Sequence, residues 1–300
     1  MFLEQLFNGL NYGLLLFLIA AGLSLVFGVM HLINLAHGSF FMLGAFAAAA
    51  CATLTGSFFL ALLLSLPGCF VISMVVERVI IRHLYGRSHL DQVLATFGLI
   101  LFFNEAIRWL SGGAPVFLAM PSALDGAVGL WPGLEYSSYR LAVTVTAALV
   151  AAGMWLVLAR TRIGMLIRAS ASNPSMVRHI GYDVRVVAML VFAMGGALAA
   201  FAGALTGPLV SIEVGMGEQV LILAFVIVVI GGLGSMKGSF WAALSIGILD
   251  TLGRAYMPYL LSGAFSARTV SSLAPAISAT LVYVLMAVVL MTRPQGLGTR

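Results

Sequence analysis

Nine apolar stretches, each near the length that a helix needs to cross a bilayer, dominate the chain. About 20 consecutive apolar residues span the hydrocarbon core, and no lysine, arginine, aspartate or glutamate occurs from Gln5 to Val76. The pattern predicts an all-α membrane protein, a polytopic bundle of eight or nine transmembrane helices. The second, seventh and eighth stretches are short, so one of them is re-entrant or broken if eight cross. The stretches are 8–30, 38–55, 58–81, 92–111, 140–159, 186–207, 219–236, 239–256 and 270–292.

The composition excludes a soluble domain and points to one membrane domain over residues 1–300. Hydrophobic residues make up 62% of the chain and charged residues only 8%, against roughly 25% charged residues in soluble proteins. The net charge of +5 comes from scattered arginines, without the basic runs that are typical of nucleic-acid binding. The first seven residues contain no base, so we expect a retained first helix rather than a cleaved signal. Cys51 and Cys69 lie in apolar stretches and suggest no metal site.

The basic residues predict an orientation, with the N-terminus outside and the C-terminus in the cytoplasm. With this assignment eleven lysines and arginines face inward and four face outward, as the positive-inside rule requires. The connection 112–139 then becomes a periplasmic loop, and the connection 160–185 becomes a cytoplasmic loop. The inward set is Arg78, Arg82, Arg87, Arg160, Arg162, Arg168, Arg178, Arg185, Lys237, Arg293 and Arg300, and the outward set is Arg108, Arg140, Arg254 and Arg268.

The cytoplasmic loop 160–185 contains a short predicted helix at residues 174–180. Asn173 is a suitable N-cap and Pro174 suits the first helical position, while Gly181 is typical of a helix end. Such a helix between two membrane helices fits a cleft of a soluble partner and moves as a rigid body. We predict that this loop couples the membrane domain to that partner. Its predicted contact residues are Arg168, Pro174, Met176, Val177, Arg178, Ile180 and Gly181.

Two similar breaks interrupt the apolar pattern. The tetrapeptide HGSF at residues 37–40 follows a polar break, and KGSF at residues 237–240 follows a glycine-rich one. Interrupted helices expose backbone polar groups, which membranes tolerate only against protein or a watery cavity. We therefore expect these residues to line or gate a solute path near the inner half, with tightly packed turns as the alternative: Asn34, His37, Ser39 and Ser235. Small residues repeat every fourth position at 44–56 and 195–207, which predicts close helix packing.

The chain lacks chemistry of its own for driving transport. The glycine-rich run at 231–237 does not have the Gly-Lys-Ser/Thr order of a phosphate-binding loop, and no acidic residue lies securely at mid-depth to couple an ion gradient. Glu105 with Arg108 and Asp250 with Arg254 are spaced to form local ion pairs. Two rival classes remain: an ion-coupled secondary transporter or channel, and an intramembrane enzyme that uses His31 or His37. No nucleophile, metal set or carboxylate pair accompanies these histidines.

Three segments resemble the permeases of branched-chain amino acid ABC importers, the LivH type. Residues 23–46, LSLVFGVMHLINLAHGSFFMLGAF, resemble the first signature of that family, and residues 231–244, GGLGSMKGSFWAAL, resemble the second. Residues 164–181, GMLIRASASNPSMVRHIG, resemble the segment that docks on the ATPase. In this segment the family usually has an acidic residue where Ser172 stands, and two alanines where Val177 and Arg178 stand.

The resemblance implies a five-part importer in the bacterial inner membrane, with a fold of the type II importer permeases. Its other parts are a second, LivM-type permease, two cytoplasmic ATPases that use ATP, and a periplasmic substrate-binding protein. This subunit is then a transport component rather than an enzyme, surrounded by membrane lipid and holding no cofactor. The cargo implied is leucine, isoleucine or valine, with urea, short amides or aromatic acids as the alternative.

Overall fold

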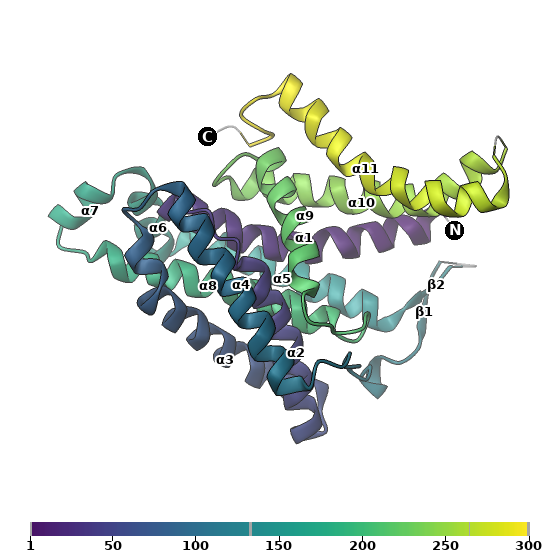
Figure 1. Ribbon diagram of the computed structural model, residues 1–300, viewed down its shortest axis with the longest axis horizontal. Coiled ribbons are helices and arrows are strands. Elements are labelled where there is room, and N and C mark those ends of the chain that lie inside the picture. Colours follow the sequence, from purple (N-terminus) through teal and green to yellow (C-terminus); the bar gives the residue numbers. More distant parts are fainter. Residues whose placement is uncertain (1, 132–133, 264, 299–300) are drawn as a thin grey trace.

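The computed structural model describes residues 2–131, 134–263 and 265–298, which are mostly helical (Figure 1). Seven helices there are long and apolar enough to cross a membrane. The elements are α1 (Phe2–Met30), α2 (His37–Thr55), α3 (Phe58–Val79), the 3₁₀ helix η1 (Ile81–Leu84), α4 (His89–Ser111), the 3₁₀ helix η2 (Ser122–Leu124), β1 (Ala127–Trp131), β2 (Leu134–Ser137), α5 (Ser138–Arg160), α6 (Arg162–Ser172), α7 (Pro174–His179), α8 (Val184–Thr206), α9 (Met216–Gly231), α10 (Met236–Ser262) and α11 (Ala267–Thr292).

Each of the nine predicted apolar stretches contains one helix, which confirms the all-α polytopic fold. The spans that meet both length and composition are α1 to α5, α8 and α11. The helix α9 has only 16 residues, and α10 has 27 residues but includes Lys237, Asp250 and Arg254. The seventh and eighth stretches, which are short in the sequence, are therefore the two whose helices fall outside the set of seven.

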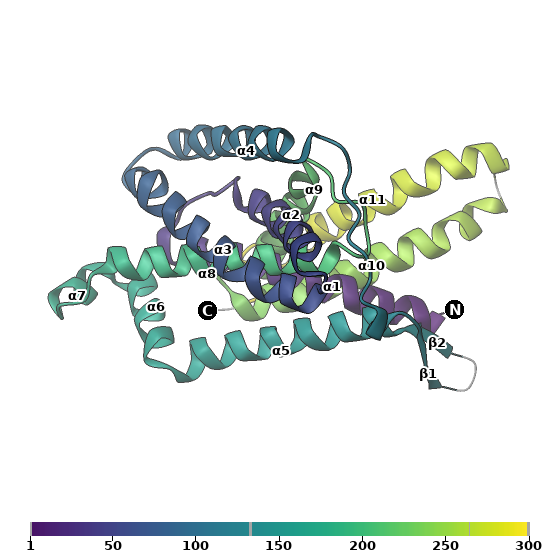
Figure 2. The same cartoon turned by 90° about the horizontal axis from the view of Figure 1, so that it is seen from below.

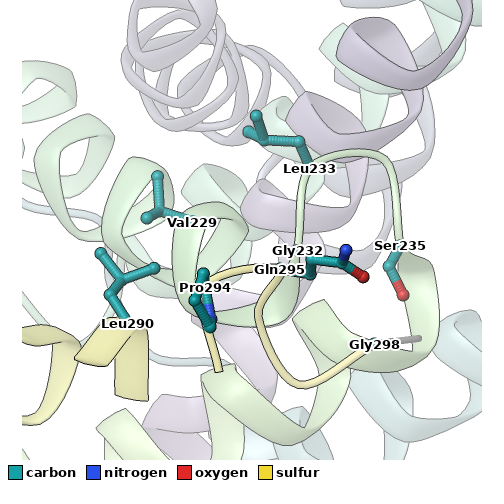
Figure 3. A pocket seen from close by; sticks show the side chains of 8 residues that line it. All are labelled: Val229, Gly232, Leu233, Ser235, Leu290, Pro294, Gln295 and Gly298. Carbon is teal, nitrogen blue, oxygen red and sulfur yellow. The ribbon is translucent and has the colours of Figure 1, made fainter. Parts of the chain in front are cut away.

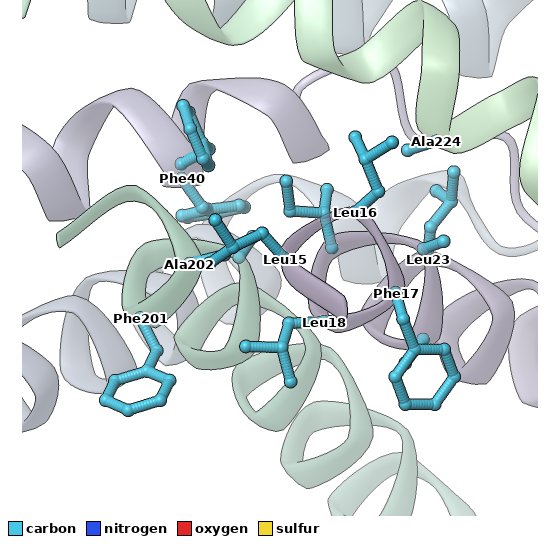
Figure 4. Close-up of a cluster of buried hydrophobic side chains, with 14 of the residues drawn as sticks. Leu15, Leu16, Phe17, Leu18, Leu23, Phe40, Phe201, Ala202 and Ala224 are labelled. Atoms are coloured by element: carbon cyan, nitrogen blue, oxygen red, sulfur yellow. The ribbon is translucent and has the colours of Figure 1, made fainter. Parts of the chain in front are cut away.

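The helices α1, α2 and α8 form the centre of the bundle. In their most apolar windows 78%, 56% and 67% of the residues are buried, against 17–28% in α3, α4, α5 and α11. Figure 4 shows leucines and phenylalanines of α1 packed against α2, α8 and α9. The outer helices instead expose many large apolar side chains, as a lipid-facing surface requires.

Small residues allow the central helices to touch backbone to backbone. A Cβ atom on Gly22 of α1 would lie 2.6 Å from the carbonyl oxygen of Gly195 in α8. A Cβ on Gly44 of α2 would overlap the carbonyl of Ala200, and a Cβ on Gly203 would overlap that of Phe41. Glycines at 44, 195 and 203 therefore serve the packing role that their spacing predicts.

The chain doubles back between α1 and α2. After Met30 the segment 31–36, in which Leu32, Asn34 and Ala36 are buried, returns along α1, and the Nε2 atom of His37 lies 3.0 Å from the carbonyl oxygen of Ile19. Ile19 stands eleven residues before Met30, which is about 16 Å along a helix. The N-terminus of α2 therefore lies beside the middle of α1, inside the protein, as expected for a broken helix.

The second break separates α9 from α10 at residues 232–235. Gly232 and Gly234 both have positive φ values, 90° and 78°, which favour glycine. The C-terminal segment 294–298 folds over this break, with the amides of Leu297 and Gly298 donating to the carbonyls of Ile230 and Gly231 at 2.8 and 2.9 Å. The end of α9 therefore gains the hydrogen bonds that its last turn cannot make internally.

The two hydrophilic connections lie at opposite ends of the long axis (Figures 1 and 2). The connection 112–139 has more structure than its loop-like composition predicts, because it contains η2 and an antiparallel hairpin of β1 with β2. The connection 160–185 contains two helices rather than the single predicted one. The helix α7 corresponds to the prediction at 174–180, whereas α6 is additional and begins where the Thr161 hydroxyl accepts a hydrogen bond from Gly164.

We expect Gly44→Ala to destabilise the protein, because the new methyl group overlaps the Ala200 carbonyl. Overpacking of this kind costs about 1–3 kcal/mol, so the melting temperature in detergent should fall by several degrees. Gly98→Ala is the matched control, since a Cβ there meets no atom within 4 Å. Equal melting temperatures for the two variants would contradict the close contact of α2 with α8.

Candidate functional site

The first break, between α1 and α2, brings three candidate polar residues together. Asn34 is fully buried, and neither atom of its amide has a hydrogen-bond partner in the described part of the chain. His37 is 1% exposed and Ser39 is 4% exposed. The backbone amide of His37 donates to the carbonyl of Asn34 at 3.4 Å, so these residues form one turn at the N-terminus of α2.

This turn packs against the first residues of α9. A Cβ on Gly38 would overlap the carbonyl of Gly217, and a Cβ on Gly217 would lie 3.2 Å from the amide of Ser39. The N-termini of α2 and α9 therefore meet inside the bundle. A helix N-terminus has a partial positive charge from its free amides, and buried polar atoms without partners cost about 1–3 kcal/mol each. The turn thus combines unpartnered polar atoms with two helix N-termini inside the bundle.

Ser235 does not join this group. Its side chain caps α10 by accepting a hydrogen bond from the amide of Gly238 at 3.2 Å, and it lies beyond the last residue of α9. Gly217 and Gly231 are fourteen residues apart on α9, or about 21 Å. The structure therefore brings Asn34, His37 and Ser39 together but leaves Ser235 near the opposite end of α9.

Ser235 instead borders a separate cavity of about 350 Å³ beside the C-terminal segment. Figure 3 shows the side chains of Ser235 and Gln295 close together over the break, with Val229, Leu233 and Leu290 on the apolar side. The C-terminal residues that form this wall have no signal in the apolar pattern, because their contacts come from backbone atoms and glycines.

The helix α7 projects from one end of the molecule (Figure 1). Asn173 caps it, with the side-chain oxygen accepting from the amide of Met176 at 3.0 Å, and Gly181 ends it with a φ of 94°. Met176 and Ile180 are 57% and 64% exposed. Val177 is only 4% exposed, so it anchors α7 to its own chain, and the predicted contact by Val177 with a partner is not available in this arrangement.

The arginines around α7 are free to meet an acidic surface. Arg168 and Arg178 are exposed, and neither belongs to the three ion pairs in the described ranges. Pro174 is exposed as well, at the first position of the helix. The segment thus exposes two apolar side chains, Met176 and Ile180, among exposed arginines.

The helix α8 links α7 to the first break. It begins at Val184, three residues after Gly181, with Asp183 as its cap. It then packs along α1, α2 and α3, and touches α2 at Phe41 and Gly44. A displacement of α7 therefore has a continuous packed route to the N-terminus of α2.

Three ion pairs join charged side chains in the described ranges. Glu105 with Arg108 at 3.2 Å and Asp250 with Arg254 at 2.8 Å confirm the pairs that the spacing predicts. The third pair, Glu77 with Arg82 at 3.5 Å, is new. The sequence gives no signal for Glu77, because this residue directly follows the uncharged stretch, where a single charge is typical of the end of a membrane span.

The histidines and cysteines of the described residues are the groups that an intramembrane enzyme would use. No group of three or more histidines, cysteines or acids there is arranged to hold a metal ion. His31 is exposed and His37 is engaged with a backbone carbonyl. Cys51 and Cys69 are both free thiols.

Known proteins resemble the chain along nearly its whole length. The family described as branched-chain amino acid transport system / permease component matches residues 5–291. BraD of Pseudomonas aeruginosa, a high-affinity branched-chain amino acid transport system permease protein, is 31% identical over 266 residues, covering 84% of this chain and 86% of BraD. No solved structure matches.

Two LivH proteins have similar identity and coverage. LivH of Escherichia coli K12 is 29% identical over 277 residues, covering 85% of this chain and 87% of that protein. The probable LivH of Methanocaldococcus jannaschii is 29% identical over 266 residues, covering 85% and 80%. The match spans both breaks and the α6–α7 segment, and the chain is therefore a multi-pass membrane protein that belongs to the family of branched-chain amino acid transport system permeases.

Proposed function

We propose that this chain is one of two permease subunits in an ATP-driven importer that moves branched-chain amino acids across a bacterial inner membrane. The observation that carries the proposal is the family match over residues 5–291, together with the names of relatives that align with more than four fifths of the chain. The partners are a LivM-type permease, two cytoplasmic ATPases and a periplasmic binding protein. The chain itself holds no cofactor, and ATP is hydrolysed by the ATPases.

The importer is tested by reconstitution. The permease, its LivM-type partner and the ATPases in liposomes should take up labelled leucine when the binding protein is outside and ATP is inside. A Walker-motif variant of the ATPases should abolish uptake, because this chain has no phosphate-binding loop. Uptake that persists with that variant and follows a proton or sodium gradient would establish the secondary transporter instead.

The same assay tests the cargo. Excess unlabelled valine or isoleucine should compete with leucine, whereas urea, a short amide or an aromatic acid should not. Competition only by one of these other solutes would keep the importer and change its substrate class.

The proposed orientation puts α6, α7 and the C-terminus in the cytoplasm. Its support is the excess of basic residues, including exposed Arg168 and Arg178, at the end of the molecule that carries α7. In this orientation α7 is the coupling helix. Met176 and Ile180 insert into the ATPase, while Val177 holds α7 against the permease.

Met176→Asp combined with Ile180→Asp should detach the ATPases or let them hydrolyse ATP without uptake. Buried apolar anchors carry most of the energy of an interface, and losing one costs about 2 kcal/mol or more. The permease should still fold, because both side chains are exposed. Pull-down of the ATPases and leucine uptake are the two measurements.

The matched control is Phe117→Asp combined with Val128→Asp. These side chains are 79% and 42% exposed and lie in the 112–139 connection at the other end of the molecule. The control should assemble like the wild type. If both double variants bind the ATPases and take up leucine normally, α7 is not the coupling helix.

The turn at Asn34 is proposed to meet the solute during its passage. Its support is the buried amide without partners next to the N-termini of α2 and α9. Asn34→Leu, whose side chain also branches at Cγ, removes two unpaired polar atoms, so stability should stay the same or rise by about 1–3 kcal/mol. Uptake should nevertheless fall, because a polar contact available to the solute is gone.

Ser24→Ala is the control for this change. The Ser24 hydroxyl is also buried without a partner, but it lies within α1 rather than at a break. It should match the wild type in uptake. An Asn34→Leu protein that is stable and transports normally would show that the turn is only a packed connection.

A further inference from the structure

Glu77 is a fully buried carboxylate that the transport proposal leaves unused. It lies in the last turn of α3, at the end of the molecule that carries α7, and its side chain is 0% exposed. Burial of a carboxylate is costly unless partners compensate for the lost water. Ionisable groups inside membrane proteins are for this reason functional candidates whose partners decide their role.

The partners of Glu77 come from the connection between α3 and α4. The Tyr85 hydroxyl donates a hydrogen bond to Oε1, and Arg82 Nη2 lies 3.5 Å from Oε2. Burial, together with the hydrogen bond to Glu77 and its charge, raises the pKa of Tyr85, so the hydroxyl remains a donor. The carboxylate thus bonds to two residues of the chain that follows α3.

The start of α4 is hydrogen-bonded to the same connection. The side-chain amide of Gln92 donates to the carbonyls of Leu84 and Arg87 at 3.2 and 3.4 Å. Glu77 fixes η1 to α3, and Gln92 fixes η1 to α4. The end of α3, η1 and the start of α4 therefore form one stiff unit, which we call the α3–α4 elbow (residues 77–92).

The elbow also contacts α8 close to α7. Arg82 Nη2 lies 4.0 Å from the sulfur of Met189, which stands five residues into α8. One turn before Glu77, Ser73 packs directly on Gly196 of α8. Arg82 is thus held between the carboxylate of Glu77 on one side and the first turns of α8 on the other.

We propose that Glu77 is a positioning residue that makes the α3–α4 elbow move together with α8. The inference rests on the proposed function, in which α7 receives the ATPase stroke. The charge on Glu77 holds the Arg82 guanidinium in place against Met189. A shift of α7 and α8 then displaces α3 and α4 as well as α2, and all three helices change position in one step.

The first test is Glu77→Gln, which keeps the shape and an oxygen that accepts from Tyr85 but removes the charge that holds Arg82. The complex should assemble and hydrolyse ATP as the wild type does. The ATP consumed per leucine should rise about fivefold, within the range that single residues contribute to coupling between sites. Arg82→Lys, which keeps the charge near Glu77, should recover part of the loss seen in Arg82→Gln. Normal coupling in Glu77→Gln would overturn the inference.

The second test measures movement directly, and it works even if the change in ATP consumed per leucine is small. Spin labels at Tyr182 and Leu90, which are 50% and 67% exposed, report on the start of α8 and the start of α4. In the full complex with Cys51 and Cys69 replaced, the distance between these labels should be the same without nucleotide and with ATP. In Glu77→Gln it should differ between the two states. A wild-type distance that changes, or a variant distance that does not, would show that the elbow and α8 are not joined through Glu77.

A third label on the ATPase separates the two proposals. If the distance from Tyr182 to this label shows that the ATPase binds away from α7, the coupling assignment fails whatever Glu77 does. If the ATPase sits on α7 and the elbow still moves independently of α8 in the wild type, only the role of Glu77 fails.

Discussion

The contact of α8 with α1 and α2 through glycine is the constraint on which the rest of the structure depends. Lipid offers no hydrophobic force to hold helices together, so association relies on close packing and on satisfied backbone groups. Gly22 against Gly195, and Gly203 against Phe41, bring main chains into direct contact. The outer helices then cover this centre, and the breaks are tolerated because they lie against it.

The sequence predicts the fold well where hydrophobicity decides the outcome. Nine apolar stretches become nine helices, and the spacing of small residues identifies glycines that do pack. The cap of α7 by Asn173 and its end at Gly181 follow from local rules that need no tertiary information. The family resemblance in the three quoted segments is confirmed by a match over residues 5–291.

Features that depend on contacts between distant segments are not visible in the sequence. Nothing in the pattern places His37 beside Ile19, or separates Ser235 from the other candidates by the length of α9. Val177 has the same apolar character as its neighbours, and only the fold shows that it faces inward. Glu77 is similar: its importance comes from burial and from Tyr85 and Arg82, which a linear reading treats as part of a basic inner end.

The C-terminal segment over the second break has a consequence for biosynthesis. The carbonyls of Ile230 and Gly231 gain their hydrogen bonds from Leu297 and Gly298, which leave the ribosome only after α10 and α11. Until then the carbonyls of Ile230 and Gly231 lack these two partners. A chain that stops before Leu297 therefore lacks the two hydrogen bonds that join its end to the end of α9.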